Sequence, residues 1–247
     1  MVTPGARLFG IGIIVLAGVC LAFGDFDFGQ SVPKEFPARA ALAYVAAVFM
    51  LVAGAGIQWP STAAWAAAAL TIYFGFIVVV LMDGRVIVAH YTEYGIYSSV
   101  AAQLAAAAGA LIVYGRHARA AQVTFGLCAV LFGGAHFFYM NLTAPLVPKW
   151  LPLSGEFWGY ATGIAHIAAG VAIVTGIQAR VAAILLTIMY ASFTPLVHLP
   201  MLFDKPSDHF VWSENALNLI LAGVAWIVAD SLAQGIKQPI RAFRVAH

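Results

Sequence analysis

Four ionisable side chains lie in or beside apolar stretches of the second half of the sequence. They are His136, His166, His198 and Glu214. Imidazole and carboxylate groups ligate zinc, copper and iron, and they also exchange protons with a bound quinone. Because an ionisable group in so apolar a setting is costly, these four residues mark a candidate functional site.

The composition places these residues in a membrane protein. The chain has 247 residues, of which 63% are hydrophobic and 9% are charged, whereas an average soluble domain has roughly 25% charged residues. This is too little charge to cover a soluble protein of this size. The composition therefore excludes a soluble enzyme, a disordered chain and a nucleic-acid binder with a basic face, so no nucleic-acid partner is expected.

Eight apolar stretches are long enough to cross a bilayer, which takes about 20 residues. They cover 7–24, 38–57, 61–82, 95–115, 121–140, 157–177, 180–199 and 211–231. The predicted fold class is all-α, a polytopic membrane protein with eight transmembrane helices in contact with the lipid bilayer. The lysines all fall in predicted loops or the C-terminal tail, which argues against a retinal protein with a Schiff-base lysine.

The charges in the loops predict the orientation. On the side of the two termini lie Arg7, Arg116, Arg119, Arg180, Lys237, Arg241 and Arg244, and on the other side lie Lys34, Arg39, Arg85, Lys149 and Lys205. This excess predicts an inner-membrane protein with both termini in the cytoplasm. The basic tail is expected to bind anionic lipid. The acidic residues on or near the outer side are Asp25, Asp27, Glu35, Asp83, Glu93, Glu156, Asp204, Asp208 and Glu214.

The two halves of the chain resemble each other at an offset of about 116 residues. The matches include Phe9-Gly10 with Phe125-Gly126, Val32-Pro33-Lys34 with Val147-Pro148-Lys149, and Ala53-Gly54 with Ala169-Gly170. We interpret the chain as a first four-helix unit over 1–116, a degenerate repeat, and a second four-helix unit over 117–247 that includes the basic tail. An even number of helices per unit predicts parallel repeats.

The same offset pairs the three histidines of the second unit with sulfur residues of the first. Cys20 corresponds to His136, Met50 to His166 and Met82 to His198. We interpret the first unit as a scaffold in which adaptable side chains replaced a polar site; a soft copper(I) site is the alternative. Pro195 interrupts the seventh span, and its counterpart is Val79, so the paired broken helices of many transporters are not expected.

The stretch from Phe125 to about Leu232 resembles the DoxX-like family of small four-helix membrane proteins. The resemblance is carried by Phe132-Gly133-Gly134-Ala135-His136-Phe137, by Val147-Pro148-Lys149-Trp150-Leu151-Pro152, by the run from Phe157 to His166 with Ala169-Gly170, by Val197-His198-Leu199-Pro200 and by Asn215-Ala216-Leu217. Many family members carry Glu at the position of His166. The resemblance implies a four-helix fold and links to quinone-coupled sulfur oxidation, redox defence, and membrane-protein assembly or export.

The predicted function is a quinone- or metal-linked membrane oxidoreductase, or the membrane subunit of one that works with other membrane or periplasmic redox subunits. His166 is the expected central ligand or proton acceptor, with His136 and His198 completing a copper, iron or zinc ligand set and Tyr160 within reach. Glu214 is expected to orient an imidazole or take a proton. The alternatives are structural histidines, a Glu214 that caps its helix, and a non-catalytic assembly factor, structural subunit or transporter built on close helix contacts.

Overall fold

The computed structural model describes residues 1–235 of the chain. Helices make up 79% of the described residues, which contain no strand. Within residues 1–235, eight helical runs are long and apolar enough to cross a membrane. The predicted all-α polytopic membrane fold is therefore confirmed. The basic tail with Lys237, Arg241 and Arg244 lies outside the described residues.

The four long helices, the π-helix and the short helix after it follow one another in the same order in both halves, and the second half adds α7 and η2 after its first long helix. The first half contains α1 (Pro4–Phe23), α2 (Arg39–Gly56), α3 (Ala63–Ile72), the π-helix η1 (Tyr73–Met82), α4 (Gly84–Ala89) and α5 (Tyr94–Tyr114). The second half contains α6 (Ala118–Phe138), α7 (Met140–Thr143), the 3₁₀ turn η2 (Ala144–Leu146), α8 (Gly155–Thr175), α9 (Ala179–Phe193), the π-helix η3 (Thr194–His198), α10 (Leu199–Asp204) and α11 (His209–Gly235). Origin by duplication stays a prediction.

The third long helix of each half changes from α to π geometry before it ends. These segments, η1 and η3, end at Met82 and His198, the residues that the sequence offset pairs. The sequence marked an irregularity only in the seventh span, at Pro195, whereas the structure has a π-helical segment in the third span as well. Pro195 signals η3 in the sequence, whereas η1 has no proline. A π-helix changes the spacing of the backbone hydrogen bonds without removing a donor, so it does not require one.

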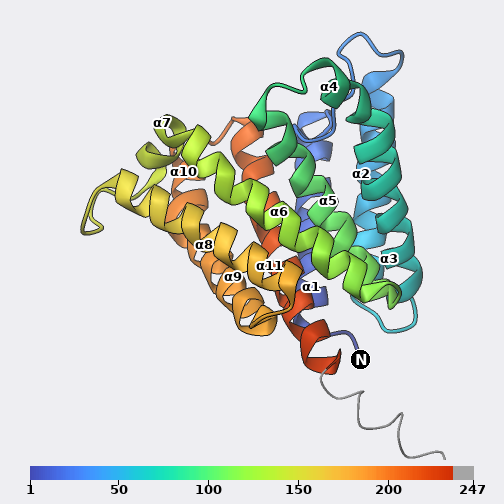
Figure 1. Ribbon diagram of the computed structural model, residues 1–247. Coiled ribbons are helices and arrows are strands. Elements are labelled where there is room, and N and C mark those ends of the chain that lie inside the picture. Colours follow the sequence, from blue (N-terminus) through green and yellow to red (C-terminus); the bar gives the residue numbers. More distant parts are fainter. Residues whose placement is uncertain (236–247) are drawn as a thin grey trace, which may run out of the picture.

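The first and last helices of the two halves hold the protein together. Helix α1 packs along α11, α5 packs along α6, and α5 also contacts α11 (Figure 1). The N-terminus and the C-terminal end of α11 lie at the same end of the bundle (Figure 1). An even number of spans places them there.

Paired glycines allow the first two helices of each half to approach closely. A Cβ added to Gly170 of α8 would lie 2.4 Å from the carbonyl oxygen of Gly126 in α6, and one added to Gly54 of α2 would lie 2.9 Å from that of Gly10 in α1. Neither distance leaves room for a side chain. Backbone contact through small residues is a common basis of helix association in lipid.

The loop over 24–38 folds back over the end of the first half that lies away from the N-terminus (Figure 1). Its residues Phe26, Asp27 and Gln30 are buried. The Ser31 backbone N–H donates to Asp83 Oδ1 at 3.1 Å, which ties the loop to the end of η1. This loop therefore places polar side chains inside the first unit, which the sequence had assigned a scaffold role.

Candidate functional site

Helices α6 and α8 bring His136 and His166 into contact. The centroids of the two imidazole rings are 5.2 Å apart, and His166 is only 2% exposed. Each histidine follows a glycine by three residues, and a Cβ added to Gly133 would lie 2.6 Å from the Gly163 carbonyl oxygen. The close crossing of α6 and α8, one turn away from the histidines, therefore positions the imidazole pair. Both histidines are predicted site residues.

Backbone carbonyls determine which ring nitrogen of each histidine carries the proton. His166 Nδ1 lies 2.9 Å from the Thr162 carbonyl oxygen, and His136 Nδ1 lies 3.2 Å from the Gly159 carbonyl oxygen. His136 Nδ1 also lies 3.1 Å from Thr162 Oγ1, whose hydroxyl donates to the Trp158 carbonyl at 2.7 Å. Because the carbonyls only accept, each neutral ring is protonated at Nδ1, which leaves a lone pair on Nε2.

Aromatic side chains surround the His166 ring. Its centroid lies 5.4 Å from that of Tyr190, 6.3 Å from that of Phe193 and 6.4 Å from that of Phe132. The Tyr190 hydroxyl is buried and has no hydrogen-bond partner among the described residues. A buried hydroxyl usually has a partner, so Tyr190 adds a free polar group beside the imidazole pair.

Two asparagines of α11 hold the end of α9 and the η3 segment. Asn218 Nδ2 donates to the Tyr190 carbonyl at 3.0 Å and to Thr194 Oγ1 at 2.8 Å, and Asn215 Nδ2 donates to the His198 carbonyl at 2.8 Å. The sequence interpretation missed the roles of Asn218 and Tyr190. An asparagine in the middle of an apolar span was a usable signal, whereas nothing in the sequence separates Tyr190 from the other eight tyrosines.

His198 does not join the imidazole pair. It ends η3, and its Nδ1 is buried without a hydrogen-bond partner in the described part of the chain. No group of three or more His, Cys, Asp or Glu side chains in residues 1–235 is placed to hold a metal ion. The described residues therefore do not assemble the three-histidine ligand set predicted from the sequence.

Tyr160 and Glu214 also lie apart from the imidazoles. Tyr160 is 44% exposed and its ring contacts Phe137, because residues six apart on a helix of 3.6 residues per turn face different directions. Glu214 makes no hydrogen bond to any histidine within the described residues. It lies instead within electrostatic range of Asp27, so the predicted orienting role for Glu214 has no contact to support it.

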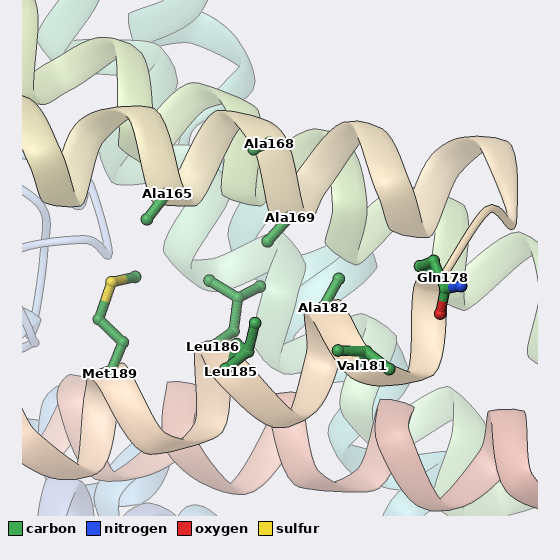
Figure 2. A pocket seen from close by; sticks show the side chains of 9 residues that line it. All are labelled: Ala165, Ala168, Ala169, Gln178, Val181, Ala182, Leu185, Leu186 and Met189. Atoms are coloured by element: carbon green, nitrogen blue, oxygen red, sulfur yellow. The ribbon is translucent and has the colours of Figure 1, made fainter.

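An apolar groove of about 300 Å³ lies between α8 and α9. Alanines of α8 form one wall, and Leu185, Leu186 and Met189 of α9 form the other (Figure 2). Ala165 and Ala169 of the first wall lie one residue before and three residues after His166. The groove therefore runs along the same stretch of α8 that contributes the buried imidazole.

A protein-family model matches part of the chain. Residues 125–229 match a family model described as a domain of unknown function (DUF8561). No curated protein and no solved structure matches the chain. The matched range begins in α6 and ends in α11, so it contains both histidines of the pair, Tyr190 and the two asparagines.

Proposed function

We propose that the protein is a DoxX-like membrane oxidoreductase, or the membrane subunit of one, that binds a quinol at the His136–His166 pair. The observation that carries this proposal is the pair of imidazoles in contact, each with Nδ1 directed at a backbone carbonyl. Two Nε2 lone pairs then face a ligand as hydrogen-bond acceptors. The chemistry that the pair supports is acceptance of a proton.

The donor and acceptor pattern favours the reduced form of a quinone. A quinol presents two hydroxyl donors, which match acceptor nitrogens, whereas the oxidised quinone presents only carbonyl acceptors. The buried Tyr190 hydroxyl supplies a further polar contact, and the aromatic walls suit a ring-shaped ligand. A metal ion is the less favoured ligand, since structural and catalytic zinc sites use at least three protein ligands.

In this proposal the protein residues hold the ligand and take its protons. His166 Nε2 accepts one hydroxyl proton, and the Nδ1–H bond to the Thr162 carbonyl stabilises the resulting imidazolium. His136 does the same for the second hydroxyl. A quinol supplies electrons as it loses these protons, and a membrane or periplasmic redox partner would receive them.

Analysis of the purified full-length protein tests this proposal. We expect quinone in the organic extract at close to one molecule per chain, and we expect the double variant His136→Leu/His166→Leu to retain little of it. Elemental analysis of the same samples measures copper, iron and zinc. Absence of quinone and of metal from the wild type, together with wild-type behaviour of His166→Ala, would reject the redox function. Bound metal without quinone would reject the quinol as the ligand of this site.

The matched π-helices favour a transporter as the second candidate. Many transporters have irregular helices at corresponding places in their two repeats, and here η1 and η3 end at residues that the repeat pairs. π-helical segments often lie at functional sites. Substrate-dependent uptake into vesicles that contain the purified protein, with no quinol binding, would favour this candidate over the oxidoreductase.

The orientation in the membrane is a separate prediction. The excess of Lys and Arg on the side of the termini leads us to expect both termini on the cytoplasmic side of a bacterial-type inner membrane. Green fluorescent protein fused to either terminus should fluoresce, because it matures only in the cytoplasm. Active alkaline phosphatase at either terminus would reverse the orientation, since that enzyme folds only on the outer side.

A further inference from the structure

A buried carboxyl group lies in the first unit, away from the histidine pair. Asp27 belongs to the loop between α1 and α2 and is 1% exposed. Its Oδ2 accepts hydrogen bonds from the Gly29 backbone N–H and from Gln103 Nε2 of α5, both at 3.0 Å. A Cβ added to Gly29 would lie 2.1 Å from Gln103 Nε2. The loop and α5 therefore fit closely around one carboxyl oxygen.

The other carboxyl oxygen and its neighbours lack hydrogen bonds. Asp27 Oδ1, Gln103 Oε1 and Ser213 Oγ are buried and have no partner among the described residues. The Ser213 hydroxyl of α11 lies beside the Asp27 carboxyl without being aligned for a bond in the present geometry. A carboxylate oxygen and an amide oxygen can only accept, whereas the Ser213 hydroxyl has one proton to donate. That proton can satisfy only one of the two acceptors, Asp27 Oδ1 and Gln103 Oε1, so the three oxygens lack one donor.

One proton on Asp27 removes most of this deficit. Protonated at Oδ1, the carboxyl group becomes a donor to Ser213 Oγ or to Gln103 Oε1, while Oδ2 keeps its two existing bonds. Neither nearby basic side chain pairs with Asp27 in the described structure. The guanidinium of Arg39 is ion-paired with Asp25, and the imidazole of His209 faces Asp27 with its buried Nε2 lacking a hydrogen-bond partner. An unpaired carboxylate in so buried a position would carry a large desolvation cost.

We propose that Asp27, Gln103 and Ser213 form a proton-binding site at the interface of the two units, with the proton held on Asp27 at neutral pH. Gln103 and Gly29 position the carboxyl group, and Ser213 brings α11 of the second unit into the site. Asp27 itself lies in a loop predicted to face the outer side. It is independent of the quinol proposal, since it shares no residue with the histidine pair.

Several titratable groups face Asp27 from the surrounding elements. They are Cys20 of α1, Tyr73 of η1, Asp83 at the end of η1, and His209 and Glu214 of α11, with Asp25 and Arg39 next to His209. Burial raises the pKa of the Asp27 carboxyl above its ordinary value. The hydrogen bonds from Gly29 and Gln103, the nearby Ser213 hydroxyl and the charge of a protonated His209 act in the opposite direction and are the smaller effects.

The sign of the pH dependence follows from this shift. A carboxyl group with a raised pKa in the folded protein binds its proton more tightly there than in the unfolded chain. Its contribution to stability is therefore complete below the ordinary carboxyl pKa and is lost as the pH rises through the folded value. The melting temperature of the wild type should fall over this range, and Asp27→Asn should flatten that fall.

Infrared spectroscopy of the full-length protein in detergent tests the proton directly. We expect a C=O stretching band of a protonated carboxylic acid at neutral pH that Asp27→Asn lacks and that Glu35→Gln keeps. Glu35 is the matched control, because it lies in the same loop and is exposed. An equal band in wild type and Asp27→Asn would overturn the proposal, since Asp27 would then be ionised.

Two further measurements keep the test decisive. Ser213→Ala retains the carboxyl group, so the band should persist and move to the frequency of a more weakly hydrogen-bonded acid; an unmoved band would remove Ser213 from the site. If Asp27→Asn does not fold, Ser213→Ala and Gln103→Leu test the proposal in its place. A carboxylic acid band at the wild-type frequency in both of these variants would overturn the proposal. Loss of the band when sodium chloride replaces choline chloride would also overturn it, because the site would then hold Na⁺.

Discussion

We expect the substitution Gly170→Ala to lower the melting temperature of the purified protein by roughly 4–12 °C. The added Cβ would lie 2.4 Å from the Gly126 carbonyl oxygen, so α8 must move away from α6. Overpacking of this kind costs about 2–3 kcal/mol, and each kcal/mol shifts the melting temperature of a domain of this size by about 2–4 °C. The measurement is thermal unfolding in one detergent, followed by circular dichroism.

Two other glycines calibrate this expectation. Gly18 of α1 has no atom within 4 Å of an added Cβ, so Gly18→Ala should not lower the melting temperature. Gly54 is the counterpart of Gly170 in the first unit, and its added Cβ would lie 2.9 Å from the Gly10 carbonyl oxygen. Gly54→Ala should therefore have an intermediate effect. Equal melting temperatures for the three variants would contradict the backbone contact between α6 and α8.

Leucine at His166 weakens the binding of decylubiquinol roughly 5- to 100-fold. The substitution removes the Nε2 acceptor and leaves one quinol hydroxyl without a partner, which costs about 1–3 kcal/mol in a buried site; a tenfold change in affinity corresponds to about 1.4 kcal/mol. Titration of the purified protein with decylubiquinol, followed by quenching of tryptophan fluorescence, measures the affinity. The oxidised form, decylubiquinone, should bind the wild type more weakly than the quinol.

Tyr160→Phe is the matched control for this substitution. Tyr160 lies on the same helix, is 44% exposed and does not face His166, so its hydroxyl should have no effect on the affinity. His136→Leu should weaken binding to a similar extent as His166→Leu, and the double variant should lose less than the sum of the two effects, because the residues act on one ligand. Wild-type affinity of His166→Leu, or tighter binding of the oxidised form, would contradict the quinol site.

The imidazole pair shows how far the sequence alone could go. His136 and His166 stood out because an ionisable side chain is rare in an apolar span, and the structure places them 5.2 Å apart. His198 met the same criterion, and its place at the C-terminal end of η3 leaves it out of the pair. Rarity in a span identifies a candidate, whereas the crossing of two helices decides which candidates meet.

The buried carboxyl group escaped the sequence interpretation for a physical reason. Asp27 lies in a loop, where carboxylates are ordinarily exposed and carry no signal. It becomes buried because the 24–38 segment folds back against Gln103 of α5 and Ser213 of α11. The three residues of the proposed proton site are far apart in the chain. The sulfur residues paired with the histidines therefore gave no indication that the first unit also contains a buried carboxyl group.

Hydrophobicity and length by themselves determined that this chain crosses a membrane eight times, because hydrocarbon admits a backbone only as hydrogen-bonded helix or closed barrel. Only the tertiary structure decided that α1 packs on α11 and α5 on α6, and that Tyr190, Gln103 and Ser213 face buried polar groups. Such choices depend on which small residues let two helix backbones touch, and that is a property of pairs of surfaces rather than of any one segment.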